Sequence, residues 1–156
     1  MQIPTLTIRQ PWASLIIAGI KTIENRSWRP PNKYLGKRIA IHAGGMLELD
    51  ALDQPWVKPH IPKLPNPLPR GAVIGTVVIT NKIIPPGSLE ELRMRDQGDP
   101  TLEWWMPDHH GWLLTDPQPL SDPIHAQGSM GIWLWEPPEG VQIKIDDMPA
   151  VEPQSE

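Results

Sequence analysis

The chain has 156 residues, of which 39% are hydrophobic and 21% charged, and this size suits one domain with a modest core. Its 21 prolines argue against a pure helix bundle, and the lack of cysteine excludes disulfides and thiolate metal sites. The net charge of −4 conceals a split, because residues 1–70 carry ten Lys or Arg against four acids and residues 71–156 carry four against fourteen. The basic part is compatible with a phosphate-bearing ligand, although solvated surface charge produces the same split.

The first predicted element is a strand over residues 3–8, where apolar and polar side chains alternate. A helix is expected to begin near Pro11 and to end near Gly19, with an apolar stripe that packs on a sheet. Residues 21–28 are predicted to be extended. Residues 38–43 form a short apolar strand that ends at a Gly-Gly pair.

Six prolines between residues 54 and 70 favour an extended, polyproline-like insertion loop. The β-branched residues 71–84 predict a buried strand, and Ser88 is a suitable cap for a short helix over residues 89–95. The pair Trp104-Trp105 is expected to form an exposed patch.

The last predicted strands cover residues 111–115 and 130–135, joined by a loop that contains three prolines. The Pro-rich, acidic residues 137–156 are predicted to form a mobile tail with, at most, a short strand over 141–145. About five strands with two or three short helices indicate an α+β fold that is mainly β, in which a small, mostly antiparallel sheet closes on itself.

The N-terminal residues lack the apolar core of a signal peptide, and no apolar run is long enough to cross a bilayer. We therefore expect a soluble, cytoplasmic protein without a membrane partner. No glycine-rich nucleotide motif occurs, and the adjacent His109 and His110 would point apart on extended chain. Neither a cofactor nor a metal site is predicted, and the oligomeric state stays open.

The densest run of polar side chains lies between Gly19 and Trp28. On a strand, Glu24 and Arg26 would share one face, while Lys21 and Asn25 would share the other. Two cations beside one carboxylate could contact phosphate or a base edge. The alternative from spacing alone is an edge strand with surface ion pairs.

The spacing Gly19-x-Lys21-x-x-Glu24-x-Arg26 resembles the GxKxxExR signature of ASCH domains, in particular those of bacteria and phages. The order of elements around it is also similar, and the resemblance covers roughly residues 3–135. It implies a PUA-like closed β-barrel with helices at its rim, formed by a single domain over residues 1–136. A cleft lined by the signature would then bind RNA, another nucleic acid or a modified nucleoside or nucleotide.

The family also contains small amidohydrolases that use the signature lysine and a threonine three residues later. Lys21 matches the first position, but Glu24 occupies the second, and a carboxylate replaces a hydroxyl poorly in attack on an amide. A hydrolase of nucleosides or RNA, either amidohydrolase or ribonuclease, with Lys21 and Glu24 as catalytic residues is therefore the alternative to a binding module. A third possibility is a protein-interaction domain that uses the proline loop as a polyproline ligand.

Aromatic faces stack on bases, and an imidazole can bind phosphate, carry a proton or make a structural hydrogen bond. The predicted ligand-binding residues combine the signature with such side chains: Trp12, Lys21, Glu24, Asn25, Arg26, Trp28 and His42.

Overall fold

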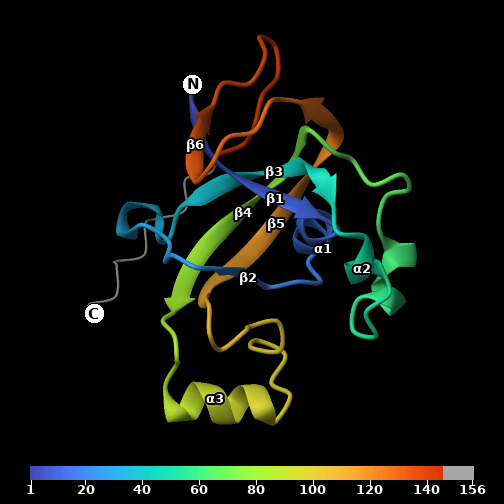
Figure 1. Cartoon of the computed structure of the whole chain (residues 1–156). Coiled ribbons are helices and arrows are strands. Elements are labelled where there is room, and N and C mark those ends of the chain that lie inside the picture. Colours follow the sequence, from blue (N-terminus) through green and yellow to red (C-terminus); the bar gives the residue numbers. More distant parts are fainter. Residues whose placement is uncertain (146–156) are drawn as a thin grey trace.

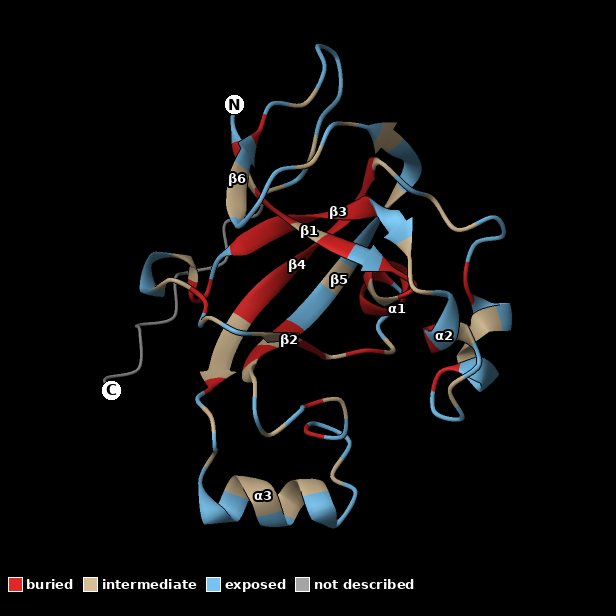
Figure 2. Ribbon diagram, in the orientation of Figure 1, coloured by how far each residue is buried: buried red, intermediate tan, exposed pale blue. Residues whose placement is uncertain are grey.

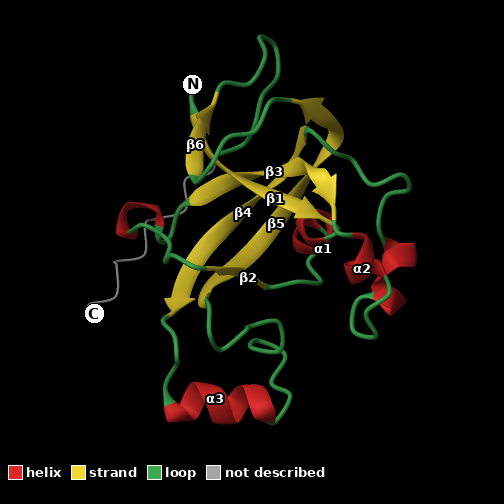
Figure 3. Cartoon of the chain, viewed as in Figure 1, coloured by secondary structure: helices red, strands yellow, loops and turns green. Residues whose placement is uncertain are grey.

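The computed structural model describes residues 1–145, and its main feature is one six-stranded sheet (Figure 1). The strands are β1 (Ile3–Gln10), β2 (Ile23–Arg26), β3 (Arg38–Leu47), β4 (Ala72–Ile83), β5 (His110–His125) and β6 (Ile132–Trp135). The helices are α1 (Trp12–Ile17), α2 (Leu49–Leu52) and α3 (Leu89–Asp96), with 3-10 turns η1 (Asn32–Tyr34) and η2 (Lys58–Lys63). Figure 3 shows these helices around the sheet, so the predicted class, α+β and mainly β, is confirmed.

The strand order is β2-β5-β4-β3-β1-β6, in which β1 and β3 are parallel and every other pair is antiparallel. Both β1 and β3 cross in front of β4 and β5, and the buried positions concentrate where these strands meet (Figure 2). The main core joins side chains from these four strands with α1, among them Leu6, Ile41, Ile79, Trp112 and Ile16. The sheet therefore curls around its own apolar face.

The predicted closure of the sheet into a barrel is not confirmed. Among the described residues, β2 pairs only with β5 and β6 pairs only with β1, which leaves these two strands as edges. The β6 pairing stops at Leu6, and the next carbonyl of β1, that of Thr7, accepts a hydrogen bond from Arg26 Nη2 at 2.8 Å. A side chain thus connects β2 to β1 where a closed barrel would need backbone pairing.

The start of α1 is held by the buried side chain of Gln10. Its Nε2 donates to Ser14 Oγ (2.8 Å) and to the Pro69 carbonyl (2.7 Å), while its Oε1 accepts from the Ser14 backbone N–H (3.0 Å). The helix ends before Gly19, whose φ of +78° suits glycine, as predicted. These bonds connect the strand, the helix and the proline loop at one point.

The prediction of a loop between two short strands is wrong for β5, which continues through Pro117, Pro119 and Pro123. Beyond Leu113 the side of β5 opposite β4 has no strand partner among the described residues, and an edge tolerates proline because the missing N–H is not needed. The pairing of β5 with β4 contains register shifts, which accommodate the extra residues of β5. At one of these shifts the Arg38 guanidinium donates to the Asp116 carbonyl at 2.9 Å.

Two further differences concern loops. The proline loop is not extended throughout, because residues 58–63 form η2, and Val57 and Leu64 pack on Leu15 in a small apolar cluster. β3 also runs through its Gly-Gly pair to Leu47 instead of ending there. In both cases tertiary packing overrides the local turn preference.

The prediction for α3 is confirmed, since Ser88 and Glu91 form a reciprocal capping box. The expectation of an exposed tryptophan patch is wrong for Trp105, which is buried beneath this helix segment and lies against Gly87. A Cβ on Gly87 would stand 2.3 Å from the Trp105 ring, so only glycine fits there.

Residues 141–145 form no strand, although Ile143 and Ile145 pack against the cluster of Ile3, Ala40, Val73 and Trp135. The rest of the predicted tail lies outside the described residues. No helix in the described part of the chain is long and apolar enough to span a membrane.

Candidate functional site

Three signature side chains meet at the edge strand β2. The turn after α1 places Lys21, whose backbone N–H donates to the Leu15 carbonyl at 3.0 Å. Lys21 Nζ donates to Glu24 Oε1 at 3.1 Å and to the carbonyl of Ile23. Arg26 Nε donates to the other carboxylate oxygen, Glu24 Oε2, at 3.2 Å. One carboxylate therefore bridges two cations.

Burial differs within this signature cluster, defined as Lys21, Glu24 and Arg26. The side chains of Lys21 and Glu24 are 5% and 9% exposed, whereas that of Arg26 is 24% exposed. The three formal charges sum to +1. Solvent reaches this positive charge mainly at Arg26, because the other two groups are buried against each other.

Trp12 lies beside the signature cluster, with its ring centroid 5.8 Å from Lys21 Nζ, a distance at which a cation and an aromatic face attract each other. Its indole Nε1 donates to Glu48 Oε2 at 3.0 Å, and Arg9 contacts Glu48 Oε1 at 3.4 Å. The sequence argument missed Glu48, since no motif singles out an acid that follows β3.

His42 contacts the side chain of Thr7, the residue whose carbonyl accepts from Arg26. Its Nδ1 is 3.2 Å from Thr7 Oγ1, which also accepts from Trp133 Nε1 at 3.0 Å, and its Nε2 is 2.6 Å from the Ala126 carbonyl. Burial lowers the pKa of His42 below its ordinary value of 6.5, the contact with Ala126 opposes this shift, and the charge of His125 adds to it. Both ring nitrogens are engaged, so the contacts of His42 are those of a structural residue.

Asn25 faces away from the signature cluster. Its Nδ2 donates to the Trp104 carbonyl at 2.9 Å, and its Oδ1 accepts from the Met106 backbone N–H at 2.8 Å. Asn25 therefore holds the loop between α3 and β5. Thr22 Oγ1 is buried and makes no hydrogen bond to a described residue.

Trp28 lies two residues beyond Arg26 and packs edge-on against the buried Trp112, with ring centroids 4.7 Å apart. The indole Nε1 of Trp112 donates to the Trp28 carbonyl at 3.0 Å. Trp28 is half-buried, so part of its ring remains accessible.

The structure thus brings Trp12, Lys21, Glu24 and Arg26 together and connects them through Thr7 to His42. Two cavities lie elsewhere: one of about 810 Å³ between the N-terminus and residues 136–143, and one of about 240 Å³ beside Arg38. Neither is lined by a residue of the signature cluster. The cluster therefore offers a charged surface with a partly exposed guanidinium and a neighbouring indole, which suits contact with an anionic, aromatic ligand.

Comparison with known proteins agrees with the signature. The family model described as ASCH domain matches residues 6–123. Activating signal cointegrator 1 of Mus musculus is 35% identical over 134 residues, and that of Homo sapiens is 33% identical over 134 residues. Each match covers 82% of this chain but 21% of the relative, so the chain spans about a fifth of the length of these curated relatives.

Solved structures that match include the crystal structure of ASCH from Zymomonas mobilis, which is 21% identical and has a TM-score of 0.44. That match covers 78% of this chain and 72% of the other. A serine-to-alanine mutant of the same Zymomonas mobilis protein is 19% identical, with a TM-score of 0.45 and coverage of 78% and 72%.

Proposed function

Because this chain belongs to the ASCH domain family, we propose that it binds RNA or a modified nucleotide through the surface around Arg26. The observation that carries the proposal is the signature cluster itself, in which a buried Lys21–Glu24 pair holds the partly exposed Arg26 guanidinium and the half-buried Trp12 indole lies 5.8 Å from Lys21 Nζ. The basic first half of the chain adds long-range attraction for an anionic ligand.

Arg26 is suited to direct contact because its known bonds use only part of its donor set. Nε and Nη2 bind Glu24 and Thr7, while Nη1 donates to no described residue. A guanidinium fixed in this way loses little conformational entropy when it binds a phosphate or the acceptor edge of a base. Trp12 and Trp28 would supply faces on which bases stack.

The other predicted site residues act through Arg26 and its neighbours in this proposal. Lys21 and Glu24 position the guanidinium, because the carboxylate binds both cations. Asn25 and His42 hold the adjacent loop and strand in place.

The test is fluorescence anisotropy with a labelled eight-nucleotide single-stranded RNA, together with a panel of modified nucleotides as competitors. Arg26→Gln should weaken RNA binding about tenfold or more, since a hydrogen bond to a charged group contributes roughly 1.5–3 kcal/mol. Arg93→Gln on the exposed surface of α3 removes the same charge and should change the affinity less than twofold.

Arg26→Lys keeps the charge and loses the fork of donors, so it should bind with intermediate affinity if it remains folded in a thermal melt. The proposal fails if Arg26→Gln and the Lys21→Ala, Arg26→Ala double variant bind the RNA and the whole panel as the parent does.

A hydrolase remains a second candidate because Lys21 Nζ and Glu24 Oε1 are 3.1 Å apart in a buried setting where a proton could be moved. Mass spectrometry of nucleosides and short RNAs incubated with the protein separates the two functions. Retention without a change of mass supports binding alone, whereas a product that disappears in Glu24→Gln supports catalysis.

A further inference from the structure

We propose that a second cationic site, formed by Arg29, Lys33, Lys82 and His110, binds a phosphate group in the backbone of an RNA strand that also contacts Arg26. This group of residues is called the basic corner below. The inference rests on the proposed function and specifies which further part of the surface an RNA strand would use.

The sheet register places the basic corner next to the signature cluster. Glu24 and Lys82 both lie opposite Trp112, on its two neighbouring strands, and Arg26 lies opposite His110. Residues directly opposite each other point to the same face of a sheet, so these side chains share one face. Lys82 is two strands away from Glu24, or about 10 Å, since neighbouring strands are roughly 4.8 Å apart.

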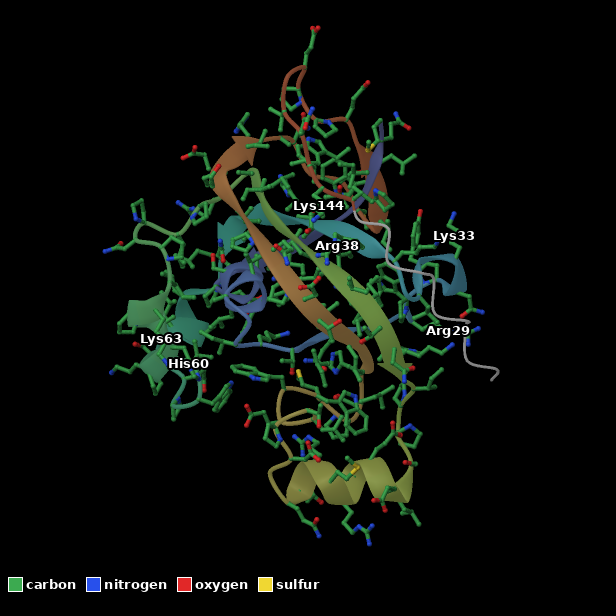
Figure 4. The ribbon with its side chains drawn as sticks, turned by 180° about the vertical axis from the view of Figure 1, so that it is seen from behind. Arg29, Lys33, Arg38, His60, Lys63 and Lys144 are labelled. Atoms are coloured by element: carbon green, nitrogen blue, oxygen red, sulfur yellow. The ribbon has the colours of Figure 1, made fainter. Side chains whose placement is uncertain are left out.

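The loop after β2 adds the remaining cations. Lys82 Nζ lies 3.4 Å from the side-chain oxygen of Asn32, which connects the end of β4 to this loop. Arg29 and Lys33 lie on either side of Asn32 in sequence, and Figure 4 shows both on the same side of the molecule. Three separate segments of chain therefore converge at the corner.

The pKa shifts of Lys82 and His110 support the closeness of the cations in the basic corner. Burial is the largest cause that lowers the pKa of Lys82, and the positive charge of Arg29 lowers it further. The pKa of His110 is lowered by burial first and then by Arg29 and Lys82. A phosphate placed among these positive groups is attracted by each of them.

His110 supplies a polar group that the rest of the described chain does not use. Its ring makes no hydrogen bond to a described residue, and its Nδ1 is buried. Buried polar atoms normally have a partner, which in a cationic setting can be the oxygen of a phosphate or an ordered water.

Trp28 lies between the two sites, because it packs on Trp112, the residue opposite both Glu24 and Lys82. A base stacked on this half-buried indole would leave its backbone free to run from Arg26 towards Lys82. A ligand that contacts both Arg26 and Lys82 must span about two strand spacings, from β2 across β5 to β4. We therefore assign the phosphate bound at the basic corner to the backbone of an oligonucleotide. The alternative is the terminal phosphate of a free nucleotide.

The experiment compares the parent with an Arg29→Gln, Lys82→Gln double variant, using RNAs of one, three and eight nucleotides that each carry a 5′ phosphate. We expect the eight-nucleotide RNA to lose tenfold or more in affinity and the mononucleotide to change less than twofold. The magnitude of the slope of log affinity against log salt should fall by about 0.7, since the loss of one phosphate contact on a single strand contributes about 0.7.

A Lys58→Gln, Lys63→Gln double variant is the matched control, because it removes the same charge from η2. Figure 4 shows Lys63 on the side of the molecule opposite Arg29. A Lys33→Gln, His110→Asn double variant tests the corner through its other two members, in case the first variant unfolds in a thermal melt.

The failures of the two proposals are distinguishable. Equal affinities of both corner variants and the control would overturn this inference, even where Arg26→Gln still weakens binding tenfold or more. Unchanged binding by Arg26→Gln would instead overturn the proposed function. An equal loss for the mononucleotide and the longer RNA would overturn the backbone assignment in favour of a terminal phosphate.

Discussion

Glu24 is the residue that balances charge in the signature cluster, because it is the common acceptor for Lys21 and Arg26. A buried ion pair contributes little net stability, but removal of one partner leaves an uncompensated charge away from water. The conservative change Glu24→Gln isolates this effect, since it keeps the size of the side chain.

We predict that Glu24→Gln lowers the free energy of unfolding by about 3 kcal/mol, measured by denaturant titration. Glu48→Gln is the control, because Glu48 bonds to Trp12 and to an exposed arginine at a more accessible position. Its cost should be below about 1 kcal/mol. Equal losses in the two variants would contradict the account of a charge-balancing carboxylate.

The lowered pKa of His42 predicts that the stability of the fold depends on pH. Burial lowers its pKa in the folded protein below 6.5, so between that lowered pKa and 6.5 the unfolded chain binds a proton that the folded chain does not. Stability should therefore be lost as the pH falls through this window and should level off above 6.5. His110 shifts in the same direction, so it adds to the slope.

The measurement is the free energy of unfolding of the parent and of His42→Asn at intervals between about pH 5 and about pH 7.5. The variant should be less stable overall and should show a shallower slope below pH 6.5. Parallel curves would mean that His42 does not contribute to the dependence.

At the scale of the elements, the close packing of α1, β4 and β5 depends on Gly75. A Cβ at this position would lie 2.7 Å from the Gln118 carbonyl oxygen and 2.9 Å from Ile17 Cδ1. The first contact is with backbone, which cannot rotate away as a flexible side chain can.

We predict that Gly75→Ala costs roughly 1–3 kcal/mol of stability, as overpacking does in other cores. Gly45→Ala has nothing within 4 Å of the new Cβ and should leave the melting temperature almost unchanged. The packing argument would be wrong if both variants melted at the same temperature.

The elements themselves were predicted where local chemistry decides. Alternation along β1, the glycine after α1 and the Ser88 cap of α3 all act within a few residues, and each predicted the observed element. The predicted strand over residues 111–115 is shorter than β5, because three prolines are incompatible with a central strand. Only the pairing of β5 with β4 shows that most of β5 is an edge, where proline is tolerated.

At the scale of the whole molecule, packing extends beyond the domain boundary predicted at residue 136, which remains a prediction. Ile143 and Ile145 lie against a cluster that includes Ile3 and Trp135. A chain that ends at residue 136 should therefore melt at a lower temperature than one that ends at residue 145. Equal melting temperatures would support the boundary at 136.

The sequence by itself determined the family, the mainly β class and the signature that contains Lys21, Glu24 and Arg26, because a motif and a binary pattern are local properties. Tertiary structure decided how the sheet ends, with Arg26 bonded to a carbonyl of β1 in place of a closing strand pair. It also decided which signature cation solvent reaches and which distant cations lie near it. Exposure and proximity arise from contacts between segments far apart in the chain, and no spacing along the sequence encodes them.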